Sequence, residues 1–364
     1  MEQINKTLLL LISHSCNLNC KYCYEWFKDS RRMSWEQAVK ILENEFQHDD
    51  EPIESVDLLG GEPLLNFEII PKICNWIWER FPNTRIFART NGTLLSESMK
   101  EWFSSNRHRF ILGLSIDGRP EVNFINRGIR NIDIEYFRQN WPDNPVKMTI
   151  FPNSVHLLVS SLKYLYNKNF KVIGGLAQGV KWDYKHCCEL EEQLSVLTDF
   201  YLCNPAITPL EPLYDLNFDK AFWIPTEDAF ETPCWKQANI HTYDCDGGLL
   251  PCHMFSSIVQ GKEKRQSVLH DMQKVNHELL PVDCQTCPIR WCCKNCMAMN
   301  YQHTGNFGDN INLKLMCDAQ KIVASASAEF IVRRAMGNTT PIYSQIEYEA
   351  VSNAIRFLKI QGKM

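Results

Sequence analysis

The sequence predicts an α/β protein that combines a parallel sheet, outer helices and a cysteine-rich segment. Three observations lead to this fold class. Apolar runs alternate with amphipathic stretches over residues 7–180. Hydrophobic residues make up 45% of the 364 residues and charged residues 22%, so the chain can bury a full core. The chain also has 16 cysteines, and most of them fall into two groups, within residues 16–23 and 234–317.

Six short runs of β type are predicted as strands, and a helical pattern follows each of them. Six β-then-α units in series predict a parallel sheet with outer helices, either doubly wound or forming an open barrel. In both arrangements the chemistry is expected at the carboxyl ends of the strands. The predicted strands cover residues 7–13, 55–59, 85–89, 110–115, 147–151 and 171–176.

Capping residues mark where several helices are expected to begin. Ser34 has capping-box spacing to Gln37, ahead of a helix over residues 38–46. Asn66 and Ser96 are predicted N-caps of the next two helices. Either Asn153 or Ser154 is predicted to start the helix that runs through residue 166.

The pattern changes after residue 205, where prolines gather in a segment without clear periodicity. Beyond the cysteines, residues 319–336 read as a helix that ends at Gly337. Pro341 suits the first turn of a last helix, which runs to about Lys359. The predicted domains are therefore 1–205 for the sheet, 206–233 for a linker, 234–320 for the cysteine-rich part and 321–364 for C-terminal helices.

Charge and hydropathy exclude several classes of protein. The chain has 38 Lys and Arg against 43 Asp and Glu, a net charge of -5, so no nucleic-acid partner is expected. The longest apolar stretch near the start, residues 8–12, is far shorter than a membrane span and carries no signal-peptide features. A secreted disulfide scaffold would have a signal sequence, so we expect a cytoplasmic protein with reduced thiols.

The first cysteine group follows directly on the first strand. Cys16, Cys20 and Cys23 are separated by three and two residues. Three thiolates on one compact loop can hold three irons of a [4Fe–4S] cluster and leave the fourth iron open. Zinc is the competing interpretation, but it requires a fourth Cys or His nearby, and His14 is predicted to lie on the strand.

Together with the strand-end motifs, this loop resembles the signature of the radical S-adenosylmethionine (radical SAM) enzymes. Residues 60–63 (Gly-Gly-Glu-Pro), 90–92 (Thr-Asn-Gly) and 115–118 (Ser-Ile-Asp-Gly) end the second, third and fourth predicted strands. The resemblance covers roughly residues 6–180 and implies a partial (β/α)6 barrel. It also implies reductive cleavage of S-adenosylmethionine to a 5′-deoxyadenosyl radical, which abstracts a hydrogen atom from a substrate C–H bond.

The same resemblance implies roles in binding S-adenosylmethionine. Gly60, Gly61 and Glu62 would meet the methionyl amino group, and Tyr22 would lie near the adenine. The Thr-Asn-Gly motif places Asn91 among the cofactor-binding residues. The remaining candidates lie after the fourth strand: Ser115 and Asp117 near the ribose and methionyl groups, and Arg127 at the carboxylate, unless Arg127 is an ordinary surface arginine.

The second cysteine group resembles the SPASM extension of radical SAM enzymes. Gly247 and Cys252 form a Gly-x4-Cys element, and residues 246–248 (Asp-Gly-Gly) suit a tight turn between two short strands. A zinc ribbon is the alternative. The resemblance implies two auxiliary [4Fe–4S] clusters, hence three clusters in all. Their implied ligands are Cys234, Cys252 and Cys296 for one cluster, and Cys284, Cys287, Cys292 or Cys293, and Cys317 for the other.

Two ligand positions stay open in the sequence. Cys293 keeps the x5 step from Cys287, whereas Cys292 keeps the x3 step to Cys296, and we lean to Cys293. The fourth ligand of the first auxiliary cluster is Cys245 or Cys203, or the position is left open for a substrate thiolate.

The resemblance implies an enzyme that oxidatively modifies a side chain of a ribosomally made peptide, forming a thioether or carbon–carbon crosslink. The second hypothesis is an anaerobic sulfatase-maturating enzyme, which makes formylglycine. In that subfamily an acidic residue serves as the base, and His253 stands at this position here. His253 could act as a base or be a surface histidine. The third is an iron–sulfur electron-transfer module without SAM chemistry. Expected partners are a peptide or protein substrate, a reductant such as flavodoxin or ferredoxin, and, if a leader peptide is used, a separate leader-binding protein.

Overall fold

The computed structural model describes residues 6–47, 53–211, 213–214, 216–222, 239–272, 282–293, 296–307, 309–337 and 344–364. Cys234, residues 223–233 of the predicted linker and Pro341 lie outside these residues. The chain divides into two compact units. The first comprises Met1–Ile116, Arg127–Val146 and Ala229–Val275, and the second Asp117–Asn126, Lys147–Asp228 and Asn276–Met364.

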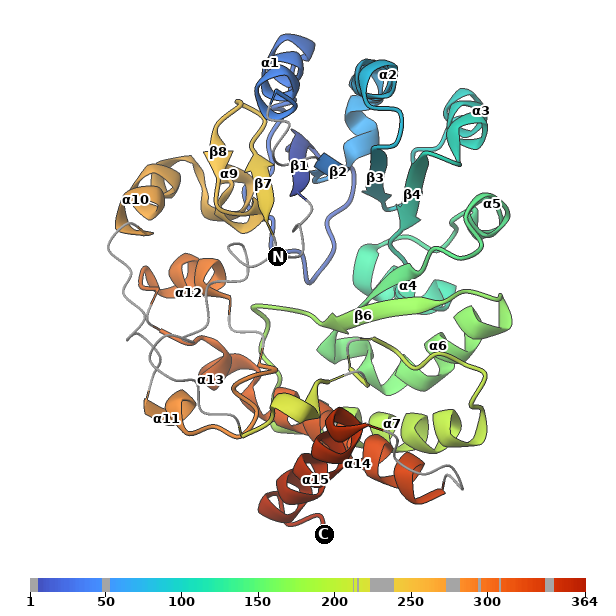
Figure 1. The fold of residues 1–364 in the computed structure, drawn as a ribbon, viewed down its shortest axis with the longest axis vertical. Helices are drawn as coiled ribbons and strands as arrows, with labels where there is room; N and C mark the ends of the chain where they lie inside the picture. Colours follow the sequence, from blue (N-terminus) through green and yellow to red (C-terminus); the bar gives the residue numbers. More distant parts are fainter. Residues whose placement is uncertain are drawn as a thin grey trace. The chain divides into compact units, whose positions relative to one another are not determined.

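The first unit is built on a six-stranded sheet in the order β4-β3-β2-β1-β7-β8 (Figure 1). Strands β1 to β4 and β7 are parallel, and β8 runs antiparallel to β7. Nearly all of β1 is buried, as expected for a strand with neighbours on both sides. The strands are β1 Lys6–Ser13, β2 Ile53–Gly60, β3 Arg85–Thr90, β4 Phe110–Leu114, β7 Ile240–Tyr243 and β8 Leu249–Leu250.

The sequence analysis did not predict that strand β7 belongs to this sheet. It comes from the cysteine-rich segment and pairs in parallel with β1, from Thr7 opposite Ile240 to Leu10 opposite Tyr243. The turn that joins β7 to β8 is the predicted one, and Gly247 has the positive φ of 79° that such a turn requires. The first cysteine loop and the Gly-x4-Cys hairpin therefore belong to one compact unit.

Helices cover the sheet of the first unit where the amphipathic patterns predict them (Figure 1). Ser34 caps α1 with the predicted capping box, and the Ser96 side chain caps α3. Asn66 is not an N-cap. It is buried inside the 3-10 helix η1, and its amide donates to the carbonyls of Ile12 at 2.9 Å and Met33 at 3.1 Å. The helices are α1 Trp35–Glu45, η1 Pro63–Ile69, α2 Ile70–Arg80, α3 Glu97–Asn106, α5 Ile134–Asn140, η5 His253–Phe255, α9 Ser257–Gln260 and α10 Lys262–Met272.

The second unit holds the other two predicted strands, which form a separate two-stranded sheet. Asn153 and Ser154 do not start the following α-helix, because Pro152 opens a 3-10 helix ahead of it. Helix α4, Pro120–Arg127, contributes its first seven residues to this unit. The other elements are β5 Val146–Ile150, η2 Pro152–Leu157, α6 Leu158–Asn167, β6 Val172–Leu176, α7 Tyr184–Cys203, η3 Phe218–Lys220, α11 Val282–Gln285, α12 Met297–Thr304, α13 Asn312–Leu315, α14 Cys317–Gly337 and α15 Gln345–Ile360.

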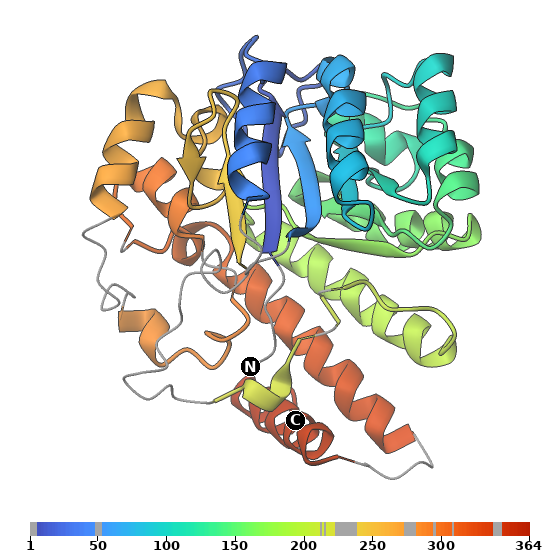
Figure 2. The same ribbon diagram turned by 45° about the horizontal axis from the view of Figure 1, so that its top comes forward.

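Helix α14 is the central element of the second unit and packs against both α7 and α15 (Figure 2). Ala324 and Ala328 are fully buried in an apolar cluster with Phe218 and Phe357. Their small side chains let the neighbouring elements approach α14 closely. The last helix begins at Gln345, with Ser344 as its N-cap. The expectation that Pro341 lies in its first turn is therefore wrong, and Pro341 itself lies outside the described residues.

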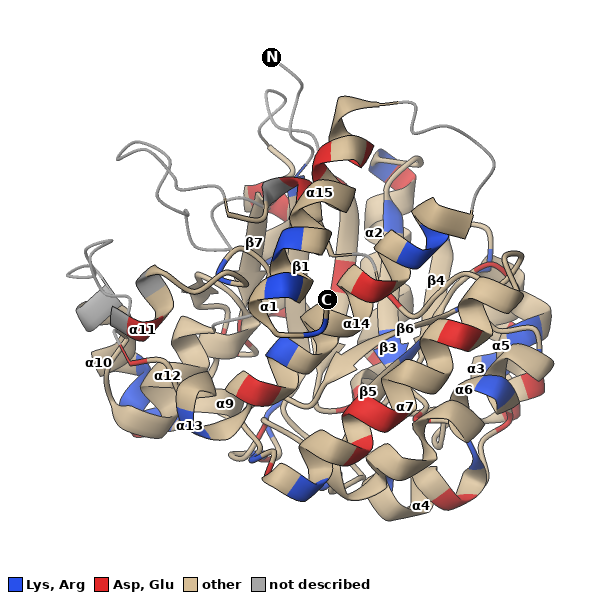
Figure 3. Cartoon of the chain, turned by 90° about the horizontal axis from the view of Figure 1, so that it is seen from below, with Lys and Arg blue, Asp and Glu red and all other residues tan. Residues whose placement is uncertain are grey.

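Charged side chains of both signs are interspersed along the helices (Figure 3). This mixture agrees with the small net charge of the sequence. Among the described residues, no helix is both long and apolar enough to cross a membrane.

Candidate active site

The three cysteines of the first group lie on the loop that directly follows β1. Cys16, Cys20 and Cys23 are half-buried, and none is in a disulfide. The Cys23 amide donates to the Cys20 carbonyl at 3.0 Å, which closes a tight turn. Burial raises the pKa of Cys16 to about 11 and also raises that of Cys23, while the Lys28 ammonium opposes the shift at both thiols. Bound iron would have to displace these protons, and three such thiols fit a cluster with one open iron.

The carboxylate of Glu62 ties this region together at the end of β2. Glu62 is 1% exposed. Its Oε1 accepts from the Thr90 hydroxyl at 2.7 Å and the Leu64 amide at 3.2 Å, and its Oε2 accepts from the Asn91 amide at 2.9 Å. Burial raises the pKa of Glu62, and these hydrogen bonds and Arg127 oppose the shift. One carboxylate thus fixes the ends of β2 and β3.

The two glycines before Glu62 are required by the chain itself. A Cβ atom on Gly60 would lie 2.2 Å from the Ser13 carbonyl oxygen, and one on Gly61 would lie 2.6 Å from that of Ser15. The Gly61 and Glu62 amides donate to these same two carbonyls, at 2.9 and 2.8 Å. The glycines therefore let the end of β2 pack directly on the start of the cysteine loop.

Asn17 is a residue that the sequence analysis missed, although it lies inside the cysteine motif. Its Oδ1 accepts from the side-chain Nδ2 of Asn91 at 2.9 Å, and its own side-chain Nδ2 donates to the Thr93 hydroxyl at 2.7 Å. The cysteine loop is therefore held to the end of β3. A short polar residue next to the first cysteine was the only signal in the sequence.

Arg127 and Tyr22 lie together in the first unit. The guanidinium carbon of Arg127 is 5.6 Å from the centre of the Tyr22 ring, a cation–π distance. Arg127 is only 7% exposed, so the surface-arginine interpretation is wrong. The arginine is placed beside the cysteine loop, where a buried cation can bind a carboxylate.

Ser115 and Asp117 follow β4 but belong to different compact units. The Ser115 amide donates to the Thr90 carbonyl at 2.9 Å in the first unit. In the second unit, Asp117 is buried, and its carboxylate accepts from the Thr149 amide at 3.0 Å and from the Asn126 side chain at 3.2 Å. These contacts fix Asp117 to the last turn of α4 and to β5.

The Gly-x4-Cys hairpin leads back to the first cysteine loop within the first unit. His253 follows the half-buried Cys252, and its Nε2 lies 3.4 Å from the hydroxyl of Tyr24. Nearby, the Phe27 amide donates to the Ile258 carbonyl at 2.9 Å. His253 therefore contacts the residue that follows Cys23.

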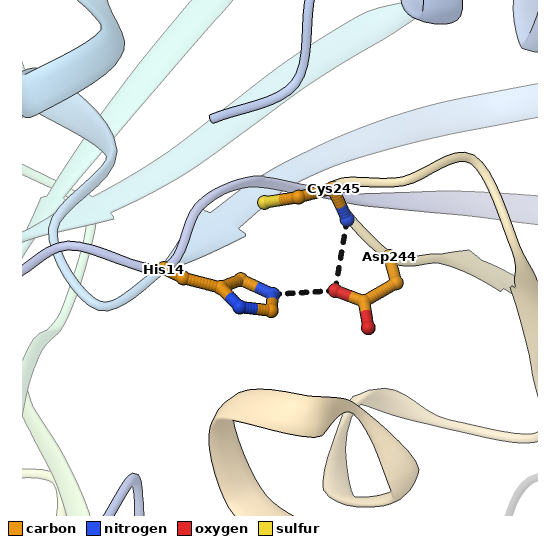
Figure 4. Close-up of side chains that lie close together, drawn as sticks. All are labelled: His14, Asp244 and Cys245. Carbon is orange, nitrogen blue, oxygen red and sulfur yellow. Dashed lines mark hydrogen bonds and ion pairs between the residues drawn. The ribbon is translucent and has the colours of Figure 1, made fainter. Parts of the chain in front are cut away.

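A buried polar cluster joins the start of the cysteine loop to this hairpin (Figure 4). His14 Nε2 lies 2.5 Å from Asp244 Oδ1, and Arg265 lies 3.2 Å from Asp244 Oδ2. Burial opposes ionisation of Asp244, but the His14 hydrogen bond and charge, with help from Arg265, lower its pKa to about 2. His14, Asp244 and Cys245 offer ligand atoms within 4.8 Å of one another. The carboxylate is already paired with the His14 ring and the Arg265 guanidinium.

Cys245 is held inside this packing. It is 2% exposed, and its Sγ donates to the Leu11 carbonyl of β1 at 3.0 Å. Burial, followed by the charge of Asp244, raises the pKa of its thiol. The other sequence candidate for the same ligand position, Cys203, is exposed at the end of α7 in the second unit.

In the second unit, the structure separates the adjacent cysteines 292 and 293. Burial raises the pKa of Cys293 to about 11; a hydrogen bond from Asn312 lowers it, and the thiols of Cys287, Cys317 and Cys284 raise it further. Cys293 is thus the electrostatic neighbour of the three other thiols proposed for one auxiliary cluster. Cys292 makes a different hydrogen bond, because its Sγ donates to the Ile289 carbonyl at 3.3 Å, and like Cys287 it lies against the apolar cluster around α14.

Residues 10–140 match the Radical SAM superfamily. This part of the chain is therefore similar to a radical SAM domain. An uncharacterized protein of Methanocaldococcus jannaschii is 34% identical over 128 residues, 35% of this chain and 43% of that protein. A cysteine-type anaerobic sulfatase-maturating enzyme of Clostridium perfringens is 28% identical over 184 residues, 44% of this chain and 48% of that enzyme. The chain thus spans less than half the length of these curated relatives.

Solved structures share the fold of this chain. Histidine-tagged anSMEcpe with bound AdoMet has a TM-score of 0.65 at 19% identity and covers 96% of this chain and 98% of that chain. Streptococcus suis SuiB bound to precursor peptide SuiA has a TM-score of 0.57 at 17% identity, over 84% of this chain and 74% of that chain. The predicted α/β radical SAM barrel with a cysteine-rich extension and C-terminal helices is therefore confirmed as the fold.

Proposed function

We propose that this protein reductively cleaves S-adenosylmethionine and oxidatively modifies a side chain of a ribosomally made peptide, in the thioether or carbon–carbon crosslink class. The observation that carries the proposal is the anchoring of the Cys16–Cys23 loop to the ends of β2 and β3 through Glu62, Asn91 and Asn17. The peptide substrate is supported by the shared fold with SuiB, whose structure holds a precursor peptide.

In this proposal, the chain's own residues bind and orient the reactants. Cys16, Cys20 and Cys23 hold the cluster, which with S-adenosylmethionine supplies a 5′-deoxyadenosyl radical when both are bound. Arg127 binds a carboxylate beside Tyr22, a role supported by its burial. Glu62 keeps the strand ends rigid, because its oxygens are already occupied by the donors of Thr90, Asn91 and Leu64. Gly60, Gly61 and Ser115 complete the same edge.

The cysteine-rich extension is proposed to hold two auxiliary [4Fe–4S] clusters. The electrostatic neighbourhood of Cys293 supports one site of Cys284, Cys287, Cys293 and Cys317. Cys234, Cys252 and Cys296 remain the proposed ligands of the other. The buried hydrogen bond of Cys245 to Leu11 favours a structural role over ligation, so the fourth position of that cluster is left for a substrate thiolate or another ligand.

The test of this proposal combines cofactor cleavage with a peptide product. The reconstituted protein is reduced without oxygen in the presence of S-adenosylmethionine, and 5′-deoxyadenosine is measured with and without a candidate precursor peptide. We expect peptide-dependent 5′-deoxyadenosine and a peptide that has lost two hydrogens, as crosslinking requires. Absence of 5′-deoxyadenosine from a cluster-loaded protein would instead support an electron-transfer module.

Sulfatase maturation is the second candidate function. Two observations favour it: the 28% identity to the Clostridium perfringens enzyme, and the contact of His253 with Tyr24 beside the cysteine loop. A sulfatase-derived peptide with the target cysteine would then be converted to formylglycine. If His253 is the base, His253→Asp should retain this conversion, whereas His253→Ala should lose it while still cleaving S-adenosylmethionine.

Two partners follow from the chemistry of the proposal. The electron that cleaves S-adenosylmethionine has to come from a low-potential reductant, for which flavodoxin or ferredoxin is proposed. If the substrate carries a leader peptide, a separate leader-binding protein is a further proposed partner. Omitting each candidate protein from the peptide assay tests its contribution.

A further inference from the structure

Two buried asparagines point their amides at sulfur atoms of the proposed auxiliary site in the second unit. Asn310 is 8% exposed and Asn312 is 3% exposed, and both lie between α12 and α14. The Nδ2 atom of Asn310 is 3.2 Å from the Sγ atom of Cys284. The Nδ2 atom of Asn312 is 3.9 Å from the Sγ atom of Cys293. Two of the four proposed ligands of one cluster thus each have an amide donor.

The orientation of the Asn310 side-chain amide is fixed by its second hydrogen bond. The Oδ1 atom of Asn310 accepts from the Asn312 backbone amide at 3.0 Å. Its NH2 group therefore has to face Cys284, since a flipped side chain would set two donors against each other. The loop between them is held as well, because the Ile311 amide donates to Oδ1 of the fully buried Asn300 at 3.1 Å.

We propose that Asn310 and Asn312 are N–H···S donors that raise the reduction potential of the auxiliary cluster held by Cys284, Cys287, Cys293 and Cys317. The inference rests on the proposed function, which places a cluster on these four cysteines. Asn310 and Asn312 are positioning residues, because they act on the cluster through its ligands.

The direction of the effect follows from charge. Reduction adds one negative charge to the cluster and its thiolates, and hydrogen bonds to the sulfurs stabilise the more negative form. The donors therefore favour the reduced cluster, which makes its oxidised form a better electron acceptor. In the proposed oxidation, the substrate radical loses one electron, the cluster gains it, and a proton leaves the substrate for solvent or a nearby base.

The test measures the midpoint potential of the auxiliary cluster by redox titration followed by electron paramagnetic resonance. The measurements use a full-length variant in which Ala replaces Cys16, Cys20 and Cys23, so that the first cluster gives no signal. Into it we introduce Asn310→Leu or Asn312→Leu, each of which removes the donor without adding a charge. The matched control is Asn353→Leu, because the Asn353 amide donates to the Phe218 carbonyl at 2.9 Å in the same unit.

We expect both variants to keep their iron and to shift one signal to a lower potential. The shift should correspond to at least a tenfold change in the reduction equilibrium, which is about 59 mV for a one-electron couple. The control should not shift. Retained iron with unchanged potentials would overturn the inference, and so would loss of the cluster from both variants, because the amides would then serve assembly. If Cys284→Ala removes no iron, the proposed cluster itself is refuted together with the inference.

Discussion

At the scale of single residues, neighbouring cysteines in this chain have different surroundings. Residues 292 and 293 are adjacent, yet successive side chains point in different directions. The Asn312 side chain donates to Cys293 Sγ at 3.9 Å, and the thiols of Cys284, Cys287 and Cys317 act on its pKa, whereas Cys292 Sγ donates to the Ile289 carbonyl at 3.3 Å. The sequence analysis favoured Cys293 as the cluster ligand from the x5 step alone, and these contacts support that choice.

The two single variants should therefore differ in iron content. Cys293→Ala should lose about four irons, because an iron without its thiolate is unprotected. Cys292→Ala should keep its iron. Iron and sulfide analysis of anaerobically reconstituted protein checks this, and equal loss in both variants would contradict the assignment of one ligand.

Glu62 is the residue on which the geometry of the strand ends depends most. Glu62→Gln replaces one acceptor oxygen by an amide donor facing Thr90, Asn91 or Leu64, so at least one buried donor loses its partner. We expect the free energy of unfolding to fall by about 1–3 kcal/mol. Glu68→Gln, an exposed change in the 3-10 helix that Glu62 caps, is the matched control for chemical denaturation and should be nearly neutral. Equal stability of the two variants would refute the anchoring role.

At the scale of elements, the β7–β8 hairpin is locked to the start of the cysteine loop by His14 and Asp244. Asp244 is fully buried, and its lowered pKa means that its ionised form stabilises the fold. The sign follows from linkage: this stabilisation is present above the unfolded pKa of about 3.9 and is lost as the pH falls toward 2.

Asp244→Asn should consequently lower the free energy of unfolding at neutral pH by about 1–3 kcal/mol, because the buried His14 ring loses its carboxylate partner and Arg265 loses a buried counter-charge. Asp246→Asn is the control, since Asp246 is half exposed and also pairs with Arg265; an exposed ion pair contributes about 0–1 kcal/mol. Anaerobic thermal unfolding of both variants measures the difference. A larger loss of unfolding free energy in Asp246→Asn than in Asp244→Asn would contradict the stabilising role assigned to Asp244.

At the scale of the whole molecule, the described cysteines of the two groups divide unevenly between the compact units. Cys252 shares a unit with Cys16, Cys20 and Cys23, whereas the residues from Cys284 onward belong to the other. The cluster proposed for Cys284, Cys287, Cys293 and Cys317 draws all its ligands from one unit. It should therefore load independently of the first cysteine group.

The combined variant Cys16→Ala, Cys20→Ala and Cys23→Ala tests this independence. It should make no 5′-deoxyadenosine, because the radical-generating cluster is gone, yet keep the irons of the extension. Iron analysis and chromatography of the nucleoside products measure both. Continued 5′-deoxyadenosine would show that the loop is not the site of cleavage.

The unaltered protein should hold about twelve irons, from three four-iron clusters. Iron, sulfide and zinc analysis after anaerobic reconstitution gives the number directly. A result of four irons together with bound zinc would indicate a zinc ribbon in the extension instead of two auxiliary clusters.

The sequence by itself determined the radical SAM domain, the strands and the order of the cysteines. Cysteine spacing is covalent, and alternating hydrophobicity acts over a few residues, so the β-type runs at residues 7–13, 55–59, 85–89 and 110–115 coincide with β1 to β4. Motifs at strand ends can be recognised for the same reason. Capping was predictable where the donor is three residues away, as at Ser34 and Ser96.

Only the tertiary structure decided which distant groups meet. It paired β7 with β1, placed Asn66 on the carbonyls of Ile12 and Met33, and set Asn310 against Cys284. These contacts join residues 26 to more than 200 positions apart, and no local pattern encodes the path of the chain between them. Burial then fixes the partners, because a polar atom removed from water has to find a hydrogen bond within the fold.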